Sequence, residues 1–265
     1  MNIKDTKTKC QAVLLDVDGT ILIREEERNS ILKDKLTSLK KSGIVVALIT
    51  ARPYSFCQSI INWLNISDPS IYNSGSYIAD QEKDYFDLNI DMSKYPELSS
   101  ALKSIENDCR EGFPSGRFFY SNNLYFQEIR NYMTNLNGFI LGGWENKRVQ
   151  GCWLRDLSEK HYQMIMELTN NFYVTHENVK NLHNIYIKPL GSTKSMAIKE
   201  WSTIMKVDLN NVVMFADGKE DIEPGKLVGI LGSPFNAIDK IKEISSITSL
   251  LNSSDGVVDL LDRLF

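Results

Sequence analysis

The sequence predicts an α/β protein in which a doubly wound parallel sheet is interrupted by an inserted α+β domain. Near both ends of the chain, short segments that are apolar on both faces alternate with amphipathic segments, as in parallel sheets covered by helices. Between about Asp80 and Asn184 the segments are richer in Tyr, Phe and Asn, which is typical of an antiparallel sheet with one face partly exposed to water. We therefore expect the sheet domain in residues 1–80 and 185–265 and the inserted domain in residues 81–184.

The N-terminal segment is expected to form a strand, a helix and a second strand. Two apolar runs, Ala12–Leu15 and Ile44–Ile49, enclose a segment whose isoleucine and leucines recur at helical spacing. Gly43 then stands where the C-terminal cap of a helix belongs. This order favours a right-handed crossover and a parallel sheet. A second helix is expected over Tyr54–Leu64 and a third strand over Ile71–Asn73.

The remaining elements follow the same two patterns. Amphipathic segments predict helices, and segments rich in β-branched and aromatic residues predict strands. The inserted domain is expected to hold two helices among several strands. The expected helices are Leu98–Cys109, Lys160–Asn170 and Met196–Trp201, and the expected strands are Phe118–Ile129, Val149–Leu154 and Val212–Phe215.

Composition excludes several classes of function. The formal net charge is −4 with Lys and Arg dispersed, which argues against a nucleic-acid partner, because such a surface carries a basic patch. No apolar run approaches the roughly 20 residues that span a bilayer, and the polar start of the chain lacks the apolar stretch of a secretory signal. We therefore expect a cytoplasmic protein with no membrane partner. In that compartment the four cysteines are ordinary thiols: Cys10, Cys57, Cys109 and Cys152.

The strongest chemical signal is LLDVDGT at residues 14–20. Asp16 and Asp18 follow an apolar strand and precede Gly19, and ligands of open parallel sheets bind beyond the carboxyl ends of the strands. Because residues two apart in an extended segment point to the same side, both carboxyl groups are expected to face one site. Two such acids need a cation between them or a shared proton. The alternative is an Asp-Gly pair that only forms a turn.

Three further signals follow predicted strands in a compatible order. Thr50 offers a hydroxyl that can bind a phosphoryl oxygen, and its alternative role is a helix N-cap. Lys194 opens a helix behind a glycine turn, where ammonium and backbone amides favour an anion; the alternative is a solvated surface lysine. Asp217 and Asp221 offer hard oxygen ligands for Mg²⁺, or form only an acidic surface turn.

Together these segments resemble the motifs of haloacid dehalogenase-like (HAD) phosphohydrolases. They are DVDGT at residues 16–20, ALITAR at 47–52, KPLGSTKSMAIKEW at 188–201 and VVMFADGKED at 212–221. The resemblance implies that Asp16 is the nucleophile and becomes a phospho-aspartate, while Asp18 protonates the leaving oxygen and then activates water. It implies that Thr50, Arg52 and Lys194 bind the phosphate, with Lys194 also offsetting the charge of the nucleophile.

The same resemblance implies an Mg²⁺ cofactor. The inner ligands would be Asp16, the backbone carbonyl of Asp18, and Asp217, with Asp221 nearby or acting through water. The last motif departs from the pattern at Ala216, in place of the first glycine, and at Glu220. The branch that the chain resembles usually reads Gly-Asp-Gly-x-Asn-Asp, and here Glu220 replaces the asparagine. The change removes a potential phosphate donor and adds a negative charge close to an anion.

The small residues at 73–76 resemble the loop that precedes an α+β cap domain in the Cof-type, sugar-phosphate phosphatase branch of this superfamily. Residues 81–184 would then be the cap. A cap that closes over the site excludes water and contacts the non-phosphate part of the substrate. Polar, aromatic and basic side chains are candidates for those contacts, with packing or solvation as the alternative: Arg117, Trp153, Arg155 and His183.

The leading functional hypothesis is Mg²⁺-dependent hydrolysis of a small phosphorylated metabolite, a sugar or polyol phosphate, through Asp16. A phosphomutase of the phosphomannomutase type is a second hypothesis, because those enzymes share the core and the type of cap. The third is a catalytically inactive metabolite-binding protein, which Glu220 and the turn at Pro224 motivate. The sequence leaves the oligomeric state open.

Overall fold

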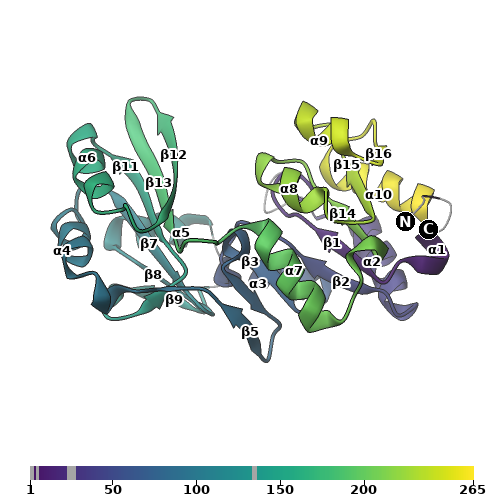
Figure 1. Cartoon of the computed structure of the whole chain (residues 1–265), viewed down its shortest axis with the longest axis horizontal. Coiled ribbons are helices and arrows are strands. Elements are labelled where there is room, and N and C mark those ends of the chain that lie inside the picture. Colours follow the sequence, from purple (N-terminus) through teal and green to yellow (C-terminus); the bar gives the residue numbers. More distant parts are fainter. Residues whose placement is uncertain (1–2, 4–5, 23–27, 133–135) are drawn as a thin grey trace. The chain divides into compact units, whose positions relative to one another are not determined.

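The computed structural model describes residues 3, 6–22, 28–132 and 136–265. By packing, the chain forms two compact units, whose elements are drawn in Figure 1. The first unit consists of Met1–Arg52, Ser59–Tyr85 and Thr193–Phe265, and the second of Pro53–Gln58 and Phe86–Ser192. Because this division is one of packing, the expected domain limits of residues 1–80, 81–184 and 185–265 stay a prediction.

A parallel sheet forms the centre of the first unit. The strands lie in the order β16-β15-β14-β1-β2, and they are β16 (Ile247–Thr248), β15 (Ile230–Ser233), β14 (Val212–Phe215), β1 (Ala12–Leu15) and β2 (Val45–Leu48). β1 pairs with β14 and β2, with Leu15 opposite Phe215 and Leu48. Every residue of β1 is buried, as expected of a central parallel strand. The predicted α/β class is confirmed, and so are the strands predicted at the positions of β1, β2 and β14.

The third predicted strand is β3 (Ser70–Tyr72), and a parallel bridge between Ile49 and Ile71 ties it to the end of β2. β3 also begins a small sheet of the order β3-β4-β5, completed by β4 (Tyr77–Ala79) and β5 (Asp84–Asp87).

Helices accompany the large sheet in two groups. α2 packs against α10, and α7 packs against α8, which also contacts α9. This arrangement is the doubly wound core that the sequence predicts. The helices of this unit, with α3 shared between the units, are α1 (Thr6–Lys9), α2 (Ser30–Lys41), α3 (Tyr54–Leu64), α7 (Lys194–Met205), α8 (Ile222–Gly225), α9 (Asp239–Ile244) and α10 (Ser253–Leu264).

The second unit is built on a sheet of the order β12-β13-β11-β7-β8-β9. Its strands are β7 (Arg110–Ser115), β8 (Phe118–Ser121), β9 (Phe139–Leu141), β11 (Cys152–Leu157), β12 (Tyr173–Val179) and β13 (Leu182–Lys188). All neighbours are antiparallel except β8 and β9. The short strands β6 (Ile90–Asp91) and β10 (Arg148–Val149) pair separately. Instead of two helices, the described part of this unit holds α4 (Pro96–Ser104), α5 (Asn123–Tyr132) and α6 (Glu159–Glu167).

The prediction of one strand over residues 118–129 is wrong in its second half, because α5 follows β8 after a single residue, Asn122. The Asn122 side chain accepts a hydrogen bond of 3.0 Å from the N–H of Tyr125, as an N-cap does. Tyr125 and Ile129, four residues apart, pack in one cluster with Phe119, which is the spacing of a helix face. The aromatic composition suited a strand, but the cap and the spacing are helical.

The first turns of α3 belong by packing to the second unit. The Phe56 ring lies edge-on to Phe119, with centroids 4.9 Å apart and planes at 81°, and edge-on to Phe139 at 5.0 Å and 72°. Such aromatic contacts add to the burial of the rings themselves. They explain why Pro53–Gln58 belongs to this unit rather than to the sheet domain in which α3 was expected.

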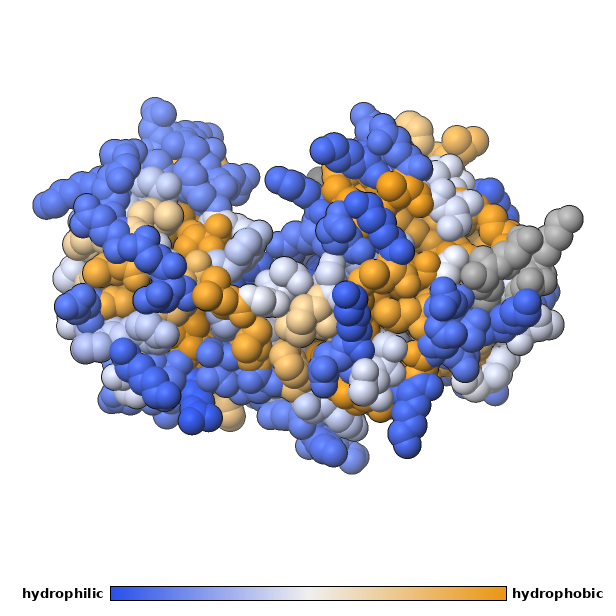
Figure 2. Space-filling view, viewed as in Figure 1, coloured by the Kyte–Doolittle hydropathy of each residue, from blue (hydrophilic) through white to orange (hydrophobic). Residues whose placement is uncertain are grey.

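The visible surface is mostly hydrophilic, and hydrophobic residues show between the polar ones (Figure 2). None of the described helices combines the length and the apolar character needed to cross a bilayer.

Glu111, on β7, is an acid inside the second unit. The residue is fully buried, and neither of its carboxyl oxygens has a hydrogen-bond partner among the described residues. Burial raises the pKa of Glu111 from 4.5 to about 9, and the nearby Glu106 adds to the effect. We therefore expect the folded protein to hold Glu111 in its protonated form at neutral pH.

This raised pKa predicts a pH-dependent stability. Below about pH 4.5 the folded and the unfolded chain both carry the proton, and between there and about pH 9 only the folded chain keeps it, so the free energy of unfolding falls as the pH rises. Glu111→Gln cannot ionise. In urea unfolding we expect it to match the wild type near pH 5 and to exceed it by about 1 kcal/mol or more near pH 8.

The exposed acid Glu97 on α4 provides the control. Glu97→Gln should stay within about 0.5 kcal/mol of the wild type at both pH values. A difference between Glu111→Gln and the wild type that does not change with pH would contradict a protonated Glu111.

Candidate active site

Lys194 lies between two buried carboxylates of the first unit. Its ammonium donates hydrogen bonds of 2.7 Å to Asp16 Oδ1 and of 2.7 Å to Asp221 Oδ1. The side chains of all three residues are at most 8% exposed. Asp16 follows β1, Lys194 opens α7, and Asp221 lies in the turn behind β14. One ammonium therefore joins three segments that are far apart in the sequence.

Burial dominates the electrostatics of this group. It raises the pKa of Asp16 to about 7 and also raises that of Asp221, in both cases against the opposing effect of Lys194. Burial alone would lower the pKa of Lys194, but the two carboxylates outweigh it and raise that pKa. The ammonium is therefore charged at neutral pH. The carboxyl groups around it can all ionise only if a further cation is present; otherwise they share a proton.

Asp217, behind β14, completes the acidic group. The Thr20 hydroxyl donates a hydrogen bond of 2.6 Å to Asp217 Oδ1. Burial raises the pKa of Asp217 to about 6; the Thr20 bond opposes this effect and the neighbouring Asp16 adds to it. Gly19, with φ of +83°, makes room for the carboxylate, since a Cβ at that position would lie 2.2 Å from Asp217 Oδ2. Any side chain at Gly19 would displace Asp217.

Asp18 and Arg52 form a second pair. Arg52 Nε and Nη2 donate hydrogen bonds of 2.9 and 2.6 Å to the two oxygens of Asp18, a forked geometry that fixes the carboxylate. The Asp18 side chain is 59% exposed, compared with 8% for Asp16. The two acids were expected to face one site together. In the structure Asp16 bonds to Lys194 and Asp18 to the guanidinium of Arg52, and a shared site for the two acids stays a prediction.

Thr50 is buried at the end of β2. Its hydroxyl oxygen accepts a hydrogen bond of 3.1 Å from the backbone N–H of Arg52, whereas α3 begins only at Tyr54. The side chain therefore closes a turn rather than capping the helix. A hydroxyl that accepts one hydrogen bond can still donate its own proton to an anion.

The acidic group suits a magnesium ion, although the chain offers no complete cage. Within residues 3, 6–22, 28–132 and 136–265, no three His, Cys, Asp or Glu side chains are spaced to hold a metal on their own. Mg²⁺, however, takes one or two protein carboxylates and keeps several waters. Asp16 and Asp217 supply that number, and their raised pKa values reflect the cost of burying negative charge. A divalent cation would relieve that cost.

Glu220, which stands where the motif that the sequence resembles has asparagine, accepts a hydrogen bond of 2.8 Å from the hydroxyl of Ser74. The helix that follows, α8, ends at Gly225 after a single turn. Glu220 therefore contacts the small-residue loop that was expected to precede the cap.

Two groups of positioning residues were missed from the sequence. Asn236 Nδ2 and Ser253 Oγ donate hydrogen bonds of 2.7 and 2.9 Å to the carbonyl of Gly19, and Thr20 and Ser74 hold carboxylates as described above. Thr20 stands within DVDGT and could have been singled out there. Ser74 lies in the small-residue loop at 73–76, Ser253 opens α10, and Asn236 belongs to no motif; only the folded chain brings these three to the site.

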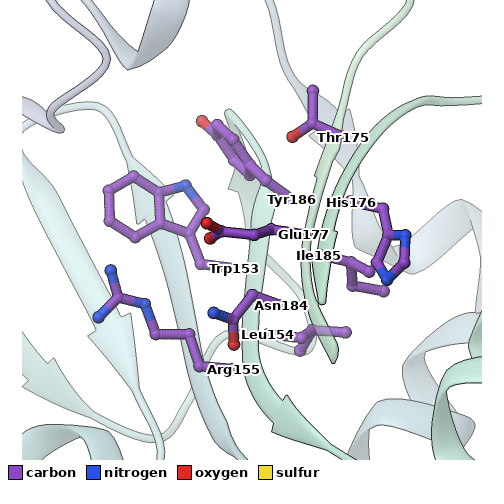
Figure 3. A pocket seen from close by; sticks show the side chains of 9 residues that line it. All are labelled: Trp153, Leu154, Arg155, Thr175, His176, Glu177, Asn184, Ile185 and Tyr186. Carbon is purple, nitrogen blue, oxygen red and sulfur yellow. The ribbon is translucent and has the colours of Figure 1, made fainter. Parts of the chain in front are cut away.

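The second unit has a pocket of its own on one face of its sheet (Figure 3). Trp153 and Tyr186 meet edge to face at its apolar side, with centroids 5.2 Å apart and planes at 79°. Polar side chains on the same face include Arg155 and Glu177, whereas His176 points away (Figure 3). The cavity measures about 280 Å³ and is lined by Trp153, Leu154, Arg155, Thr175, His176, Glu177, Asn184, Ile185 and Tyr186.

Of the four candidates for substrate contacts, Trp153 and Arg155 line this pocket, and the other two lie elsewhere. Arg117 donates a hydrogen bond of 2.9 Å to the hydroxyl of Tyr54. His183 is buried, with its ring nitrogens 2.8 Å from His176 Nε2 and 2.8 Å from Glu159 Oε2.

Comparison with known proteins relates the whole chain to one family. A family model described as haloacid dehalogenase-like hydrolase matches residues 13–261. The 5-amino-6-(5-phospho-D-ribitylamino)uracil phosphatase YitU of Bacillus subtilis is 22% identical, over 98% of this chain and 99% of its own length. Phosphoglycolate phosphatase 1 of Saccharolobus solfataricus is 23% identical, over 95% of this chain and 94% of its own. The solved sugar phosphatase BT4131 of HAD subclass IIB shares the fold with a TM-score of 0.72 at 15% identity, over 96% of this chain and 98% of its own.

The buried ammonium predicts a large and pH-dependent loss of stability on its removal. Lys194→Met leaves Asp16 and Asp221 buried without their cation, and we expect the free energy of unfolding to fall by about 3 kcal/mol or more near pH 8. Near pH 5 the two acids take up protons, so the loss should be smaller there by about 1 kcal/mol or more. Urea unfolding in EDTA at both pH values measures the effect.

Lys35→Met is the matched control, because Lys35 pairs with Asp262 on the surface. That variant should lose less than about 1 kcal/mol, independently of pH. Equal losses in the two variants would show that Lys194 does not neutralise a buried acidic group.

Proposed function

The chain belongs to the haloacid dehalogenase-like hydrolase family, and from this premise we propose that it is a magnesium-dependent phosphatase that hydrolyses a small phosphomonoester through a phospho-aspartate on Asp16. We propose residues 1–80 and 185–265 as the catalytic core and residues 81–184 as the cap.

The contact between Lys194 and Asp16 supports the proposal most directly. A carboxylate that attacks a phosphate must approach a group of like charge, and an ammonium 2.7 Å from Asp16 offsets both charges. Because the Asp16 side chain is only 8% exposed, water screens this attraction weakly.

In the first half-reaction, an oxygen of Asp16 forms a bond to phosphorus while the bond to the leaving oxygen breaks. Asp18 gives its proton to that oxygen, so the product leaves as a neutral alcohol. The forked contact with Arg52 keeps Asp18 oriented, and its exposure leaves it accessible to the leaving group. For this step Asp18 must carry the proton that it gives to the leaving oxygen.

In the second half-reaction, water attacks phosphorus and passes a proton to Asp18. The bond between phosphorus and Asp16 breaks, so inorganic phosphate leaves and both acids return to their starting states. The Thr50 hydroxyl and the Lys194 ammonium would bind the phosphoryl oxygens throughout.

Magnesium would be held by Asp16, Asp217 and the backbone carbonyl of Asp18, with Asp221 close by. When bound, it supplies positive charge to the phosphoryl oxygens as negative charge develops on them. Thr20 keeps Asp217 oriented for this role.

For the substrate we propose a sugar or polyol phosphate. The names of the relatives cover a phosphorylated ribitylaminouracil, phosphoglycolate and sugar phosphates, which share a phosphate ester on a small polar molecule.

The proposal predicts that turnover requires both Asp16 and Mg²⁺. Phosphate release from a panel of sugar phosphates, polyol phosphates and p-nitrophenyl phosphate should fall more than about 1,000-fold in Asp16→Asn, because amides are poor nucleophiles. It should also fall to background in EDTA and return when Mg²⁺ is added.

Asp34→Asn, at an exposed position on α2, controls for loss of a distant carboxylate and should keep wild-type rates. Wild-type rates in Asp16→Asn would overturn the phospho-aspartate. Retention of phosphate in the sugar pool as an isomer would instead indicate the mutase.

A further inference from the structure

Glu220 carries a negative charge beside the candidate active site. It lies in the short turn Lys219–Asp221, directly before Asp221, and is exposed. Its Oε2 atom accepts a hydrogen bond of 2.8 Å from the Ser74 hydroxyl. The bond gives this surface carboxylate a defined direction.

The loop that holds Glu220 is itself fixed against two segments of the site. Ser74 is 2% exposed, and its backbone N–H donates a hydrogen bond of 3.0 Å to the carbonyl of Thr50. The next residue, Gly75, has φ of +103°, and a Cβ there would lie 2.2 Å from the carbonyl oxygen of Thr193. Ser74 therefore presents its hydroxyl from a rigid position between the end of β2 and the start of α7.

This placement puts the charge of Glu220 near the groups proposed to bind phosphate. Thr50 is one hydrogen bond from Ser74, and Lys194 follows Thr193 at the start of α7. The ammonium of Lys194 is already shared by Asp16 and Asp221. Glu220 is also adjacent in sequence to Asp221, which shares that ammonium.

We propose that Glu220, oriented by Ser74, selects phosphomonoesters whose non-phosphate part carries no second anionic group. The inference rests on the proposed phosphatase activity and narrows its substrate class to neutral or cationic esters. A substrate anion close to the phosphate meets Glu220 at short range, where like charges repel. Phosphoglycolate, the substrate in the name of one relative, would be disfavoured here.

Three esters of nearly equal size test the charge alone. Phosphoglycolate carries a carboxylate, 2-hydroxyethyl phosphate a neutral hydroxyl, and phosphoethanolamine an ammonium. In the wild type we expect kcat/KM to be lowest for phosphoglycolate. The measured quantity is kcat/KM for 2-hydroxyethyl phosphate divided by kcat/KM for phosphoglycolate, called the selectivity ratio below. In Glu220→Gln, which keeps an oxygen for the Ser74 hydroxyl, this ratio should fall by about 5-fold.

Glu223→Gln is the matched control, because Glu223 lies three residues on and pairs at the surface with Lys226. Its ratio should stay within about twofold of the wild type. If the selectivity ratio of Glu220→Gln stays within about twofold of the wild type, the proposal that Glu220 selects the substrate is wrong. An equal fall of the ratio in Glu220→Gln and Glu223→Gln would also contradict it. Absence of turnover with all three esters and with p-nitrophenyl phosphate would overturn the proposed function itself.

Salt separates a charge effect from a structural one. Raising the ionic strength from about 0.05 M to about 0.5 M shortens the screening length from about 14 Å to about 4 Å. Over this range the selectivity ratio of the wild type should fall, and the selectivity ratio of Glu220→Gln should change little. Equal salt dependence in both proteins would count against an electrostatic role.

Ser74→Ala tests the orientation of the carboxylate. It keeps the charge of Glu220 and removes the hydrogen bond, so its ratio should fall between those of the wild type and Glu220→Gln. Full wild-type discrimination in Ser74→Ala would refute the orienting role of Ser74.

Discussion

The candidate site depends on one interaction, the buried pairing of the Lys194 ammonium with the carboxylates of Asp16 and Asp221. Charged groups are stable away from water only when they are paired at short range. This pairing requires the end of β1, the start of α7 and the turn behind β14 to meet within hydrogen-bond distance. The parallel register of β1 and β14 supplies that meeting, since Leu15 lies opposite Phe215. The position of the proposed nucleophile is thus a property of the whole sheet.

The two units bury carboxyl groups by different means. In the first unit one lysine pairs with both Asp16 and Asp221, and the negative charge that remains suits an added cation. In the second unit Glu111 has no such partner among the described residues and is expected to keep its proton. The first arrangement retains charge in the candidate site, whereas in the second the acid gives up its charge inside a hydrophobic core. The proposed chemistry accordingly needs only groups of the first unit.

The sequence predicted the features that depend on neighbouring residues. β1 and β14 were expected because strands buried on both faces are apolar throughout, and Asp16, Lys194 and Asp217 were expected because each follows a predicted strand or opens a predicted helix. The prediction of a strand over residues 123–129 failed because it rested on the content of Tyr and Phe, which are common in strands. The N-cap at Asn122 and the helical spacing of Tyr125 and Ile129, which indicate a helix, were overlooked. Contacts between distant loops were also missed, such as that of Ser74 with Glu220, because neither residue marks its partner in the sequence.

The pairing of β1 with β14 also determines when the protein can complete its fold during synthesis. β1 leaves the ribosome well before β14 and gains β2 soon afterwards, but its other edge stays open until Val212–Phe215 has been made. The second unit is synthesised in that interval, and its hairpins join residues close in sequence, which favours early folding. The nascent chain meanwhile exposes an unpaired hydrophobic strand, a site for aggregation. The cellular yield of this protein should therefore depend on chaperones as well as on its final stability.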